Sequence, residues 1–267
     1  MKLAIYSHCA LDTITIDGNS YEQIGGAASY CGIMARELKF DVDLFTKYGP
    51  DFPKQYLVEN KINLINSESN KNTTKFSISI SGSDRTLKLE NECDPIDYSD
   101  VDANGHIVSP IFHEISEDVF EKIKSNSNFL FVDPQGFLRQ KDSDNNIILK
   151  NTNLDLSGVN AIKINPEEGK NIVDGTPDEM MLALQKKGIE HVLLTDKTNV
   201  SLLVKNRIYS LKLPNKTVHD TTGIGDIFCS AFTCTMLKEK DFLWALCFAA
   251  GSAQAALESN NVGLQKI

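Results

Sequence analysis

Apolar segments typical of buried β-strands alternate with helical segments along most of this 267-residue chain. The strand patterns cover residues 2–7, 106–110, 129–133, 160–164 and 191–195. Helical patterns cover residues 117–124, 177–187, 226–237 and 242–257. Apolar strands separated by helices form parallel sheets that are covered by helices on both faces. The sequence therefore predicts one α/β domain over residues 1–267, with a doubly wound, mostly parallel sheet.

Two other segments alternate polar and apolar residues instead. Residues 13–24 turn at Asp17-Gly18-Asn19, and residues 74–89 turn at 81–84. Alternation of this kind is typical of a sheet with one face exposed. We expect the two hairpins to form one small sheet. The alternative is an ordinary extension at the edge of the large sheet.

The segment Asp220-Thr221-Thr222-Gly223-Ile224-Gly225-Asp226, which opens an apolar helix, carries the strongest chemical signal. Its two glycines let backbone N–H groups converge, and the helix N-terminus adds a partial positive charge. This is a pocket for a transferring phosphoryl group, and Asp226 is placed to take a proton from an attacking hydroxyl. A short glycine motif also occurs where a loop simply packs against a helix. A dinucleotide fingerprint is excluded, because Phe228 replaces its third glycine.

This segment resembles the signature of the ribokinase-like (PfkB) family of sugar and nucleoside kinases, and differs from it only at Ile224. The family's Gly-Gly motif is matched at residues 25–30, and the Gly-x-Asp that follows it is matched at 49–51. A third motif, Asn-x-x-Glu, is matched at 165–168. The motifs occur in family order across nearly the whole chain. The resemblance implies a ribokinase-like fold in which the small sheet is a lid over the substrate.

The resemblance also implies a reaction, the transfer of the γ-phosphoryl group of ATP to a hydroxyl of a small polyhydroxylated acceptor. Asp226 would be the general base, and the N–H groups of Gly223, Ile224 and Gly225 would stabilise the transferring group. Asn165 and Glu168 would organise the phosphates and Mg²⁺, with Glu168 acting through water. A helix-start acid is the alternative role for Glu168. A requirement for a monovalent cation is left open.

Ligands of such sheets bind at the carboxyl ends of the strands, which places Asp12, Asp133, Asn165, Thr195 and the loop 223–226 along one rim. The resemblance implies that the acceptor contacts Asp12, Gly25, Gly26, Tyr30 and Arg139. A hairpin-turn acid is the alternative role for Asp12, and a solvated loop cation is the alternative for Arg139. The resemblance implies that the nucleotide contacts Asn165, Thr195, Ala250 and Ala253, and close helix packing is the alternative for the two alanines.

The chain departs from the family pattern at two places that matter for substrates. Tyr30 replaces an asparagine that binds substrate hydroxyls, and Thr195-Asp196-Lys197 lacks the glycine of the family's Thr-x-Gly. The identity of the acceptor is therefore left open: a sugar, an inositol-like polyol or a nucleoside. A non-catalytic sensor on the same fold is the competing function, and the presence of Asp226 and both glycines disfavours it.

Composition limits the partners. The formal net charge is −9, with no basic stripe to offset it, so we expect no nucleic-acid binding. The longest apolar stretch, residues 242–251, is about half a membrane span, and we expect a cytoplasmic protein without a membrane contact. Apolar residues on one face of the second hairpin, Phe76, Ile78 and Ile80, led us to expect a homodimer joined through the lids.

Overall fold

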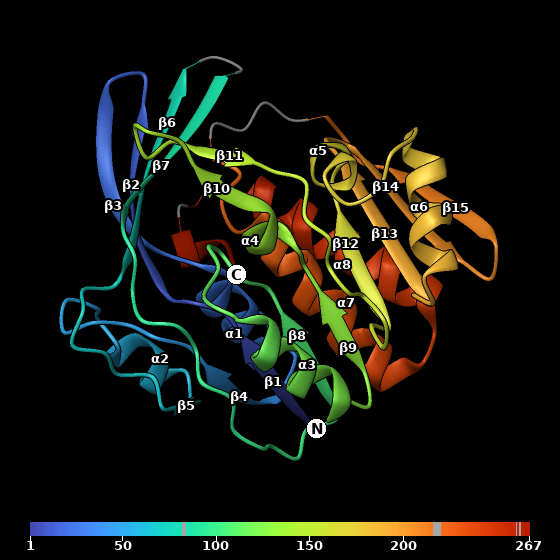
Figure 1. The fold of residues 1–267 in the computed structure, drawn as a ribbon, viewed down its shortest axis with the longest axis horizontal. Helices are drawn as coiled ribbons and strands as arrows, with labels where there is room; N and C mark the ends of the chain where they lie inside the picture. The colour runs from blue at the N-terminus through green and yellow to red at the C-terminus, as the bar shows by residue number, and fades with distance from the viewer. Residues whose placement is uncertain (82–83, 216–219, 260, 262) are drawn as a thin grey trace.

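The computed structural model describes residues 1–81, 84–215, 220–259, 261 and 263–267. Within these residues, nine strands form one large sheet in the order β15-β14-β13-β12-β9-β8-β1-β4-β5 (Figure 1). Neighbours from β13 to β5 run parallel, whereas β14 and β15 continue from β13 as antiparallel strands. The strands are β1 (Lys2–Tyr6), β4 (Asp41–Phe45), β5 (Ile62–Ile65), β8 (Gly105–Val108), β9 (Leu130–Val132), β12 (Ala161–Ile164), β13 (His191–Asp196), β14 (Asn199–Val204) and β15 (Arg207–Lys212). The predicted mostly parallel sheet is confirmed.

Helices cover both faces of this sheet. Alternate residues of β1 enter different cores, since Leu3 and Ile5 pack in one apolar cluster and Ala4 and Tyr6 in the other. The first cluster includes α1 (Ala27–Glu37), α7 (Ile224–Glu239) and α8 (Phe242–Glu258), and the second includes α3 (Glu117–Ser125) and α6 (Pro177–Lys186). Shorter helical segments are α2 (Gln55–Glu59), α4 (Gln135–Leu138), α5 (Pro166–Lys170) and the 3₁₀ helix η1 (Gly263–Lys266). None of the described helices is long and apolar enough to cross a membrane.

Helix α7 is held at its first turn by contacts with α1. The Cys31 thiol donates to the carbonyl oxygen of Asp226 at 3.3 Å, and the Ser230 hydroxyl donates to the carbonyl oxygen of Cys31 at 2.8 Å. Because α7 is apolar on nearly every side, it lies in the interior between the sheet, α1 and α8. Its N-terminus, where the glycine motif lies, is therefore fixed in position by packing.

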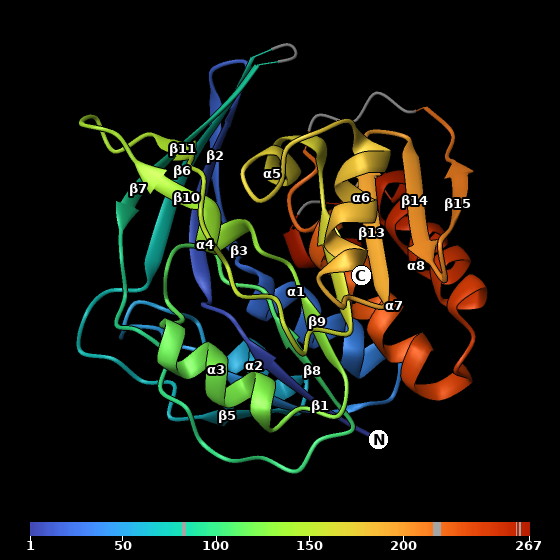
Figure 2. The same cartoon turned by 45° about the vertical axis from the view of Figure 1, so that its right-hand side comes forward.

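The two hairpins form one smaller sheet, as the sequence predicts. Its order is β3-β2-β6-β7, with β2 (Ala10–Ile16) parallel to β6 (Thr74–Ser81) in the middle. The outer strands β3 (Asn19–Gly25) and β7 (Asp84–Asn91) are antiparallel to their neighbours. Residues 82–83 of the predicted second turn lie outside the described residues. Figure 2 shows this sheet standing beside the large sheet, with the hairpin β10 (Arg139–Lys141) and β11 (Ile147–Leu149) next to β7.

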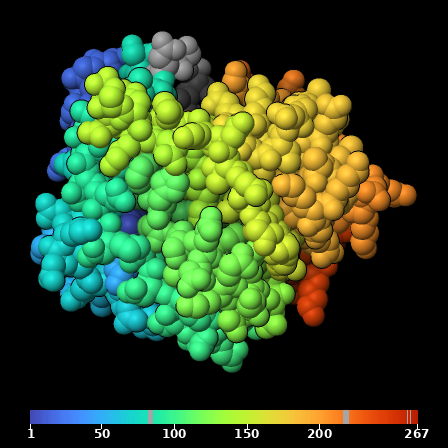
Figure 3. All heavy atoms as spheres, in the orientation of Figure 1, coloured from blue at the N-terminus to red at the C-terminus, as the bar shows by residue number. Residues whose placement is uncertain are grey.

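The apolar face of the small sheet points inward. Phe76 and Ile78 are buried and line a cavity, and Ile80 packs against the core. Our reason for expecting a dimer was therefore wrong, because Phe76 and Ile78 face the cavity and Ile80 packs against the core, so the three do not form an apolar face open to a second copy. In the space-filling view, residues of the 110–165 region, coloured green to yellow, gather over the middle of the face that is shown (Figure 3).

A homodimer through the small sheet stays a prediction, and it now depends on the strand edge alone. In the described chain β3 is an outer strand of this sheet, and outer strands present unpaired N–H and C=O groups that pair with other chains. We expect sedimentation velocity at micromolar concentration to show a dimer. A monomer at every concentration would rule it out.

Candidate active site

A cavity of about 260 Å³ lies between the carboxyl ends of the central strands and the small sheet. It collects most of the residues predicted from the sequence. Nine of them line it: Asp12, Gly26, Tyr30, Arg139, Asn165, Glu168, Gly223, Gly225 and Asp226. Residues far apart in the chain thus meet at the edge of the sheet where ligands of α/β proteins bind.

Gly223 is required by the local backbone. It is the N-cap of α7 with φ of 80°, a left-handed conformation that side chains rarely adopt. A Cβ on Gly223 would lie 2.3 Å from the Tyr30 ring. The Ile224 N–H donates to the carbonyl oxygen of Thr221 at 3.3 Å, so this N–H group, predicted to face the phosphoryl group, is already engaged by the turn.

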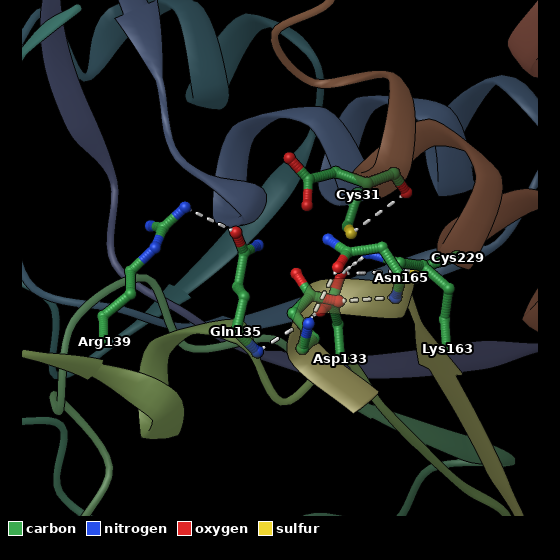
Figure 4. A network of polar contacts seen from close by, with 9 residues as sticks. Cys31, Asp133, Gln135, Arg139, Lys163, Asn165 and Cys229 are labelled. Carbon is green, nitrogen blue, oxygen red and sulfur yellow. Dashed lines mark hydrogen bonds and ion pairs between the residues drawn. The ribbon is translucent and has the colours of Figure 1, made fainter. Parts of the chain in front are cut away.

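Asp226 lies beside a buried ion pair. The Lys163 ammonium is 2.6 Å from Oδ2 of Asp133, and both side chains are buried (Figure 4). Burial and the charge of Asp133 raise the pKa of Asp226 to about 7, against the opposing effect of Lys163. A carboxyl group that titrates near neutral pH is suited to proton transfer.

Lys163 is the main residue that sequence reasoning missed. It lies within β12, where an apolar strand would place an aliphatic side chain. Its pKa is held well above the ordinary value by Asp133 and Glu168, although burial alone would lower it. The sequence did contain a signal for Lys163, because a lysine in a buried strand two residues before Asn165 needs an acidic partner. Asp133, which we had placed on the same rim without a role, is that partner.

Asn165 and Glu168 form a reciprocal cap at the start of α5. Oδ1 of Asn165 accepts from the Glu168 N–H at 2.8 Å, and Oε2 of Glu168 accepts from the Asn165 N–H at 2.9 Å. Burial raises the pKa of Glu168, and the charge of Lys163 opposes this. Glu168 therefore does cap the start of α5, and the reciprocal bonds also orient the side chains of Asn165 and Glu168 at the cavity wall.

The side of the cavity where we expect the acceptor is built around Asp12. Burial raises the pKa of Asp12 to about 7, and its Oδ1 has no hydrogen-bond partner among the described residues. Gly25 lies directly behind it, where a Cβ would stand 1.9 Å from Oδ2 of Asp12. Gly25 therefore acts by leaving room for the carboxylate and does not itself line the cavity. The hydroxyl of Tyr30 is a second buried polar group with no partner in the described chain.

Arg139 is held in place by its own contacts. Its guanidinium donates to the carbonyl oxygen of Ile111 and to Oε1 of Gln135, each at 2.8 Å, and lies over the Phe76 ring. Figure 4 shows its bond to Gln135, and the contact with Phe76 of β6 joins the segment after β9 to the small sheet. Gln135 supports Arg139 and lines the cavity.

The other nucleotide candidates lie elsewhere. Thr195 is near the end of β13, and Ala250 and Ala253 on α8 are only 1% and 6% exposed. None of the three lines this cavity. Their contact with a nucleotide remains a prediction.

Comparison with known proteins assigns the chain to a class of phosphotransferases that act on alcohols. The family model for the pfkB family of carbohydrate kinases matches residues 58–266, so the chain belongs to this family. No curated protein sequence matches the chain.

Several solved structures share the fold over nearly their whole length. A pyrophosphate-dependent kinase in the ribokinase family, complexed with a pyrophosphate analog and myo-inositol, is 19% identical with a TM-score of 0.88, over 99% of this chain and 97% of that one. The ribokinase of Arabidopsis thaliana, complexed with ribose and ATP, is 16% identical with a TM-score of 0.75, over 100% and 95%. A nucleoside kinase of Methanocaldococcus jannaschii is 16% identical with a TM-score of 0.72, over 100% and 96%.

Proposed function

We propose that this kinase transfers the terminal phosphoryl group of ATP to a hydroxyl of a small polyol, with Asp226 as the general base. The observation that carries the proposal is the shared position of Asp226, Gly223 and Gly225 on one cavity wall at the start of α7. A base and a helix N-terminus on the same wall can act on the two reacting groups at once, the hydroxyl and the phosphoryl group.

Charge around this wall suits a phosphoryl group in transit. The Lys163 ammonium stands 3.4 Å from the position that a Cβ on Gly225 would occupy. Arg139 also lines the cavity. We propose that Lys163 and the N–H groups of Gly223 and Gly225 stabilise the equatorial oxygens, which carry the charge in the transition state. Asp133 would keep the lysine aimed at them.

The donor set fits a magnesium ion that is held mainly by phosphates. No three acidic, histidine or cysteine side chains of the described residues are close enough to hold a metal by themselves. Mg²⁺ commonly keeps several waters and binds to one or two carboxylates and substrate phosphates. We propose that Glu168 contacts the ion through water, and that the ion neutralises charge on the donor phosphates.

Glu168→Gln is expected to raise the Mg²⁺ concentration needed for half-maximal turnover and to lower the rate, because an ionised oxygen near the metal's water shell is lost. A glutamine keeps the reciprocal cap, so the fold should stay intact. Glu167→Gln is the matched control, since Glu167 is the exposed neighbour with the same charge. An unchanged magnesium titration would leave Glu168 with only its helix-start role.

The cavity supports an acceptor of the size of a monosaccharide or an inositol. Its volume of about 260 Å³ is below the usual range of about 300–1,000 Å³ for ligand pockets. The unpartnered oxygens of Asp12 and Tyr30 offer hydrogen bonds to hydroxyl groups. We therefore place a sugar or an inositol-like polyol ahead of a nucleoside as the acceptor.

The small sheet would serve as the lid over this acceptor. Phe76, Ile78 and Leu87 present apolar surface to the cavity. Apolar side chains at this place would exclude water, which otherwise competes with the acceptor for the phosphoryl group.

Pyrophosphate is the second candidate donor. The observation in its favour is that Thr195, Ala250 and Ala253, the expected nucleotide contacts, do not line the described cavity. A structural neighbour that is 19% identical is a pyrophosphate-dependent kinase. Pyrophosphate has no nucleobase, so it would need only the phosphate-facing groups around Gly223, Lys163 and Asn165.

The donor is tested by initial rates with ATP, GTP, ADP and pyrophosphate, each with sugars, inositols and nucleosides as acceptors. The proposal predicts turnover with ATP and a sugar or inositol. Turnover with pyrophosphate alone would select the second candidate. Ligand binding without turnover for every pair would favour the non-catalytic sensor.

A further inference from the structure

Lys266, in η1, is one of the most buried lysines of the described chain. Its side chain is 2% exposed. The ammonium donates to three oxygens, the carbonyl oxygen of Asp220 at 3.1 Å, Oδ2 of Asp220 at 2.9 Å and the carbonyl oxygen of Thr222 at 3.0 Å. A lysine ammonium has three donors, so these contacts use all of them.

The three oxygens belong to the segment that leads directly into the glycine motif. Asp220 and Thr222 also bond to each other, since Oδ1 of Asp220 accepts from the Thr222 N–H at 2.9 Å. Burial alone would raise the pKa of Asp220, but the bonds from Lys266 and Thr222 hold it below the ordinary value. The segment therefore enters Gly223 with the carbonyl groups of Asp220 and Thr222 tied to one cation.

Lys266 itself does not line the cavity. It acts on the cavity indirectly, through the backbone of residues 220–222. Because η1 packs against β3 and α1, the position of the ammonium is fixed. A carboxylate and two carbonyl oxygens that converge on one point also form a ligand set for a monovalent cation. The tethered ammonium fills this point without any ion having to bind.

We propose that Lys266 is a positioning residue that serves as a built-in cation for the phosphoryl-binding turn. Its ammonium holds residues 220–222 so that the N–H groups of Gly223 and Gly225 face the transferring group. The inference depends on the proposed function of Asp226 and Gly223. It also answers the open question of a monovalent cation: turnover does not need one.

The test compares Lys266→Met with the wild type in buffers whose monovalent cation is tetramethylammonium, K⁺ or NH₄⁺ at equal ionic strength. Wild-type turnover should be the same in all three. In tetramethylammonium, Lys266→Met should lower kcat by about 10- to 100-fold, the size of effect that a displacement of about 1 Å causes. Lys266→Ala should show the same loss, and because its short side chain leaves the ammonium position open, K⁺ or NH₄⁺ should restore much of its kcat. Tetramethylammonium is too large to fit among the three freed oxygens. KM for the acceptor should change little.

Lys186→Met is the matched control, because Lys186 is an exposed lysine on α6 and its loss removes the same charge. It should respond to none of these cations. A wild-type kcat that rises several-fold with K⁺, or a Lys266→Met variant with wild-type kcat, would overturn the proposal.

Hydrogen–deuterium exchange gives a readout that needs no activity. Peptides covering 220–226 should exchange faster in Lys266→Met and Lys266→Ala than in the wild type, and K⁺ should slow the exchange again in Lys266→Ala. If Lys266→Met is too unstable to assay, the wild-type cation series still decides the claim. If the wild type transfers no phosphoryl group, the proposed function fails, while unchanged exchange in the variant would separately refute the tether.

Discussion

Asp226→Asn is expected to lower kcat by about 10²–10⁴-fold, because the amide keeps the size of the carboxyl group but cannot accept a proton. Donor binding should stay within a few-fold of the wild type, since the N–H groups of α7 and Lys163 are untouched. Steady-state kinetics and calorimetric titration of the donor measure both effects. A variant that retains near-normal turnover on a confirmed acceptor would remove Asp226 from the mechanism.

The same substitution should not destabilise the fold. Burial and Asp133 raise the pKa of Asp226 to about 7 in the folded state, so the folded state loses stability as the pH rises from the ordinary carboxyl pKa of about 4 to about 7, and the whole cost is present at pH 8. Asparagine removes that cost, so the thermal midpoint of Asp226→Asn at pH 8 should equal or exceed that of the wild type. A loss of activity with a retained midpoint separates a catalytic defect from misfolding.

The raised pKa also fixes the direction of the pH dependence. A protonated Asp226 cannot act as a base, so wild-type kcat should fall as the pH drops below about 7. Asp12 titrates in the same range, also with a pKa of about 7. The pH dependence of kcat in Asp12→Asn distinguishes the two carboxyl groups. If Asp226 causes the fall in kcat below about pH 7, this variant should still show that fall.

Gly223→Ala is expected to lower kcat by about 10²-fold or more, since the loss of an aligned backbone donor has effects of this size. The added methyl group would lie 2.3 Å from the Tyr30 ring, and the residue would keep a φ of 80°. The turn must shift, and the N–H groups shift with it. The free energy of unfolding should also fall, by about 1–3 kcal/mol.

Gly158→Ala separates the two causes. Gly158 has the same φ of 80°, but nothing lies within 4 Å of the position of its Cβ. It should therefore lose stability from backbone strain and keep full turnover. Equal kinetic effects at the two glycines, or no kinetic effect at Gly223, would contradict a specific role for the turn at α7.

The sequence was sufficient for the fold because its periodic patterns are strong. The apolar helices α7 and α8 and the buried strand β13 were predicted nearly to their ends. The short elements α4, α5 and β10–β11 were not, since a few residues carry too little periodicity to distinguish a helix turn from a loop.

The site was less completely predictable. Asp226, Gly223 and Glu168 belong to contiguous motifs, which a sequence displays directly. The Lys163–Asp133 pair and the contact of Lys266 with Asp220 join residues 30 and 46 positions apart, and only the fold brings them together. Tyr30, where the family has an asparagine, packs its ring against Gly223.

The central claim is that this cavity transfers a phosphoryl group to an alcohol. It is tested most directly by ³¹P NMR of the wild-type protein with donor, Mg²⁺ and a panel of sugars and inositols. We expect a new phosphate-monoester resonance that grows as the donor is consumed, and no such resonance with Asp226→Asn over the same time. An unchanged donor, or its hydrolysis to orthophosphate with every acceptor, would contradict the claim.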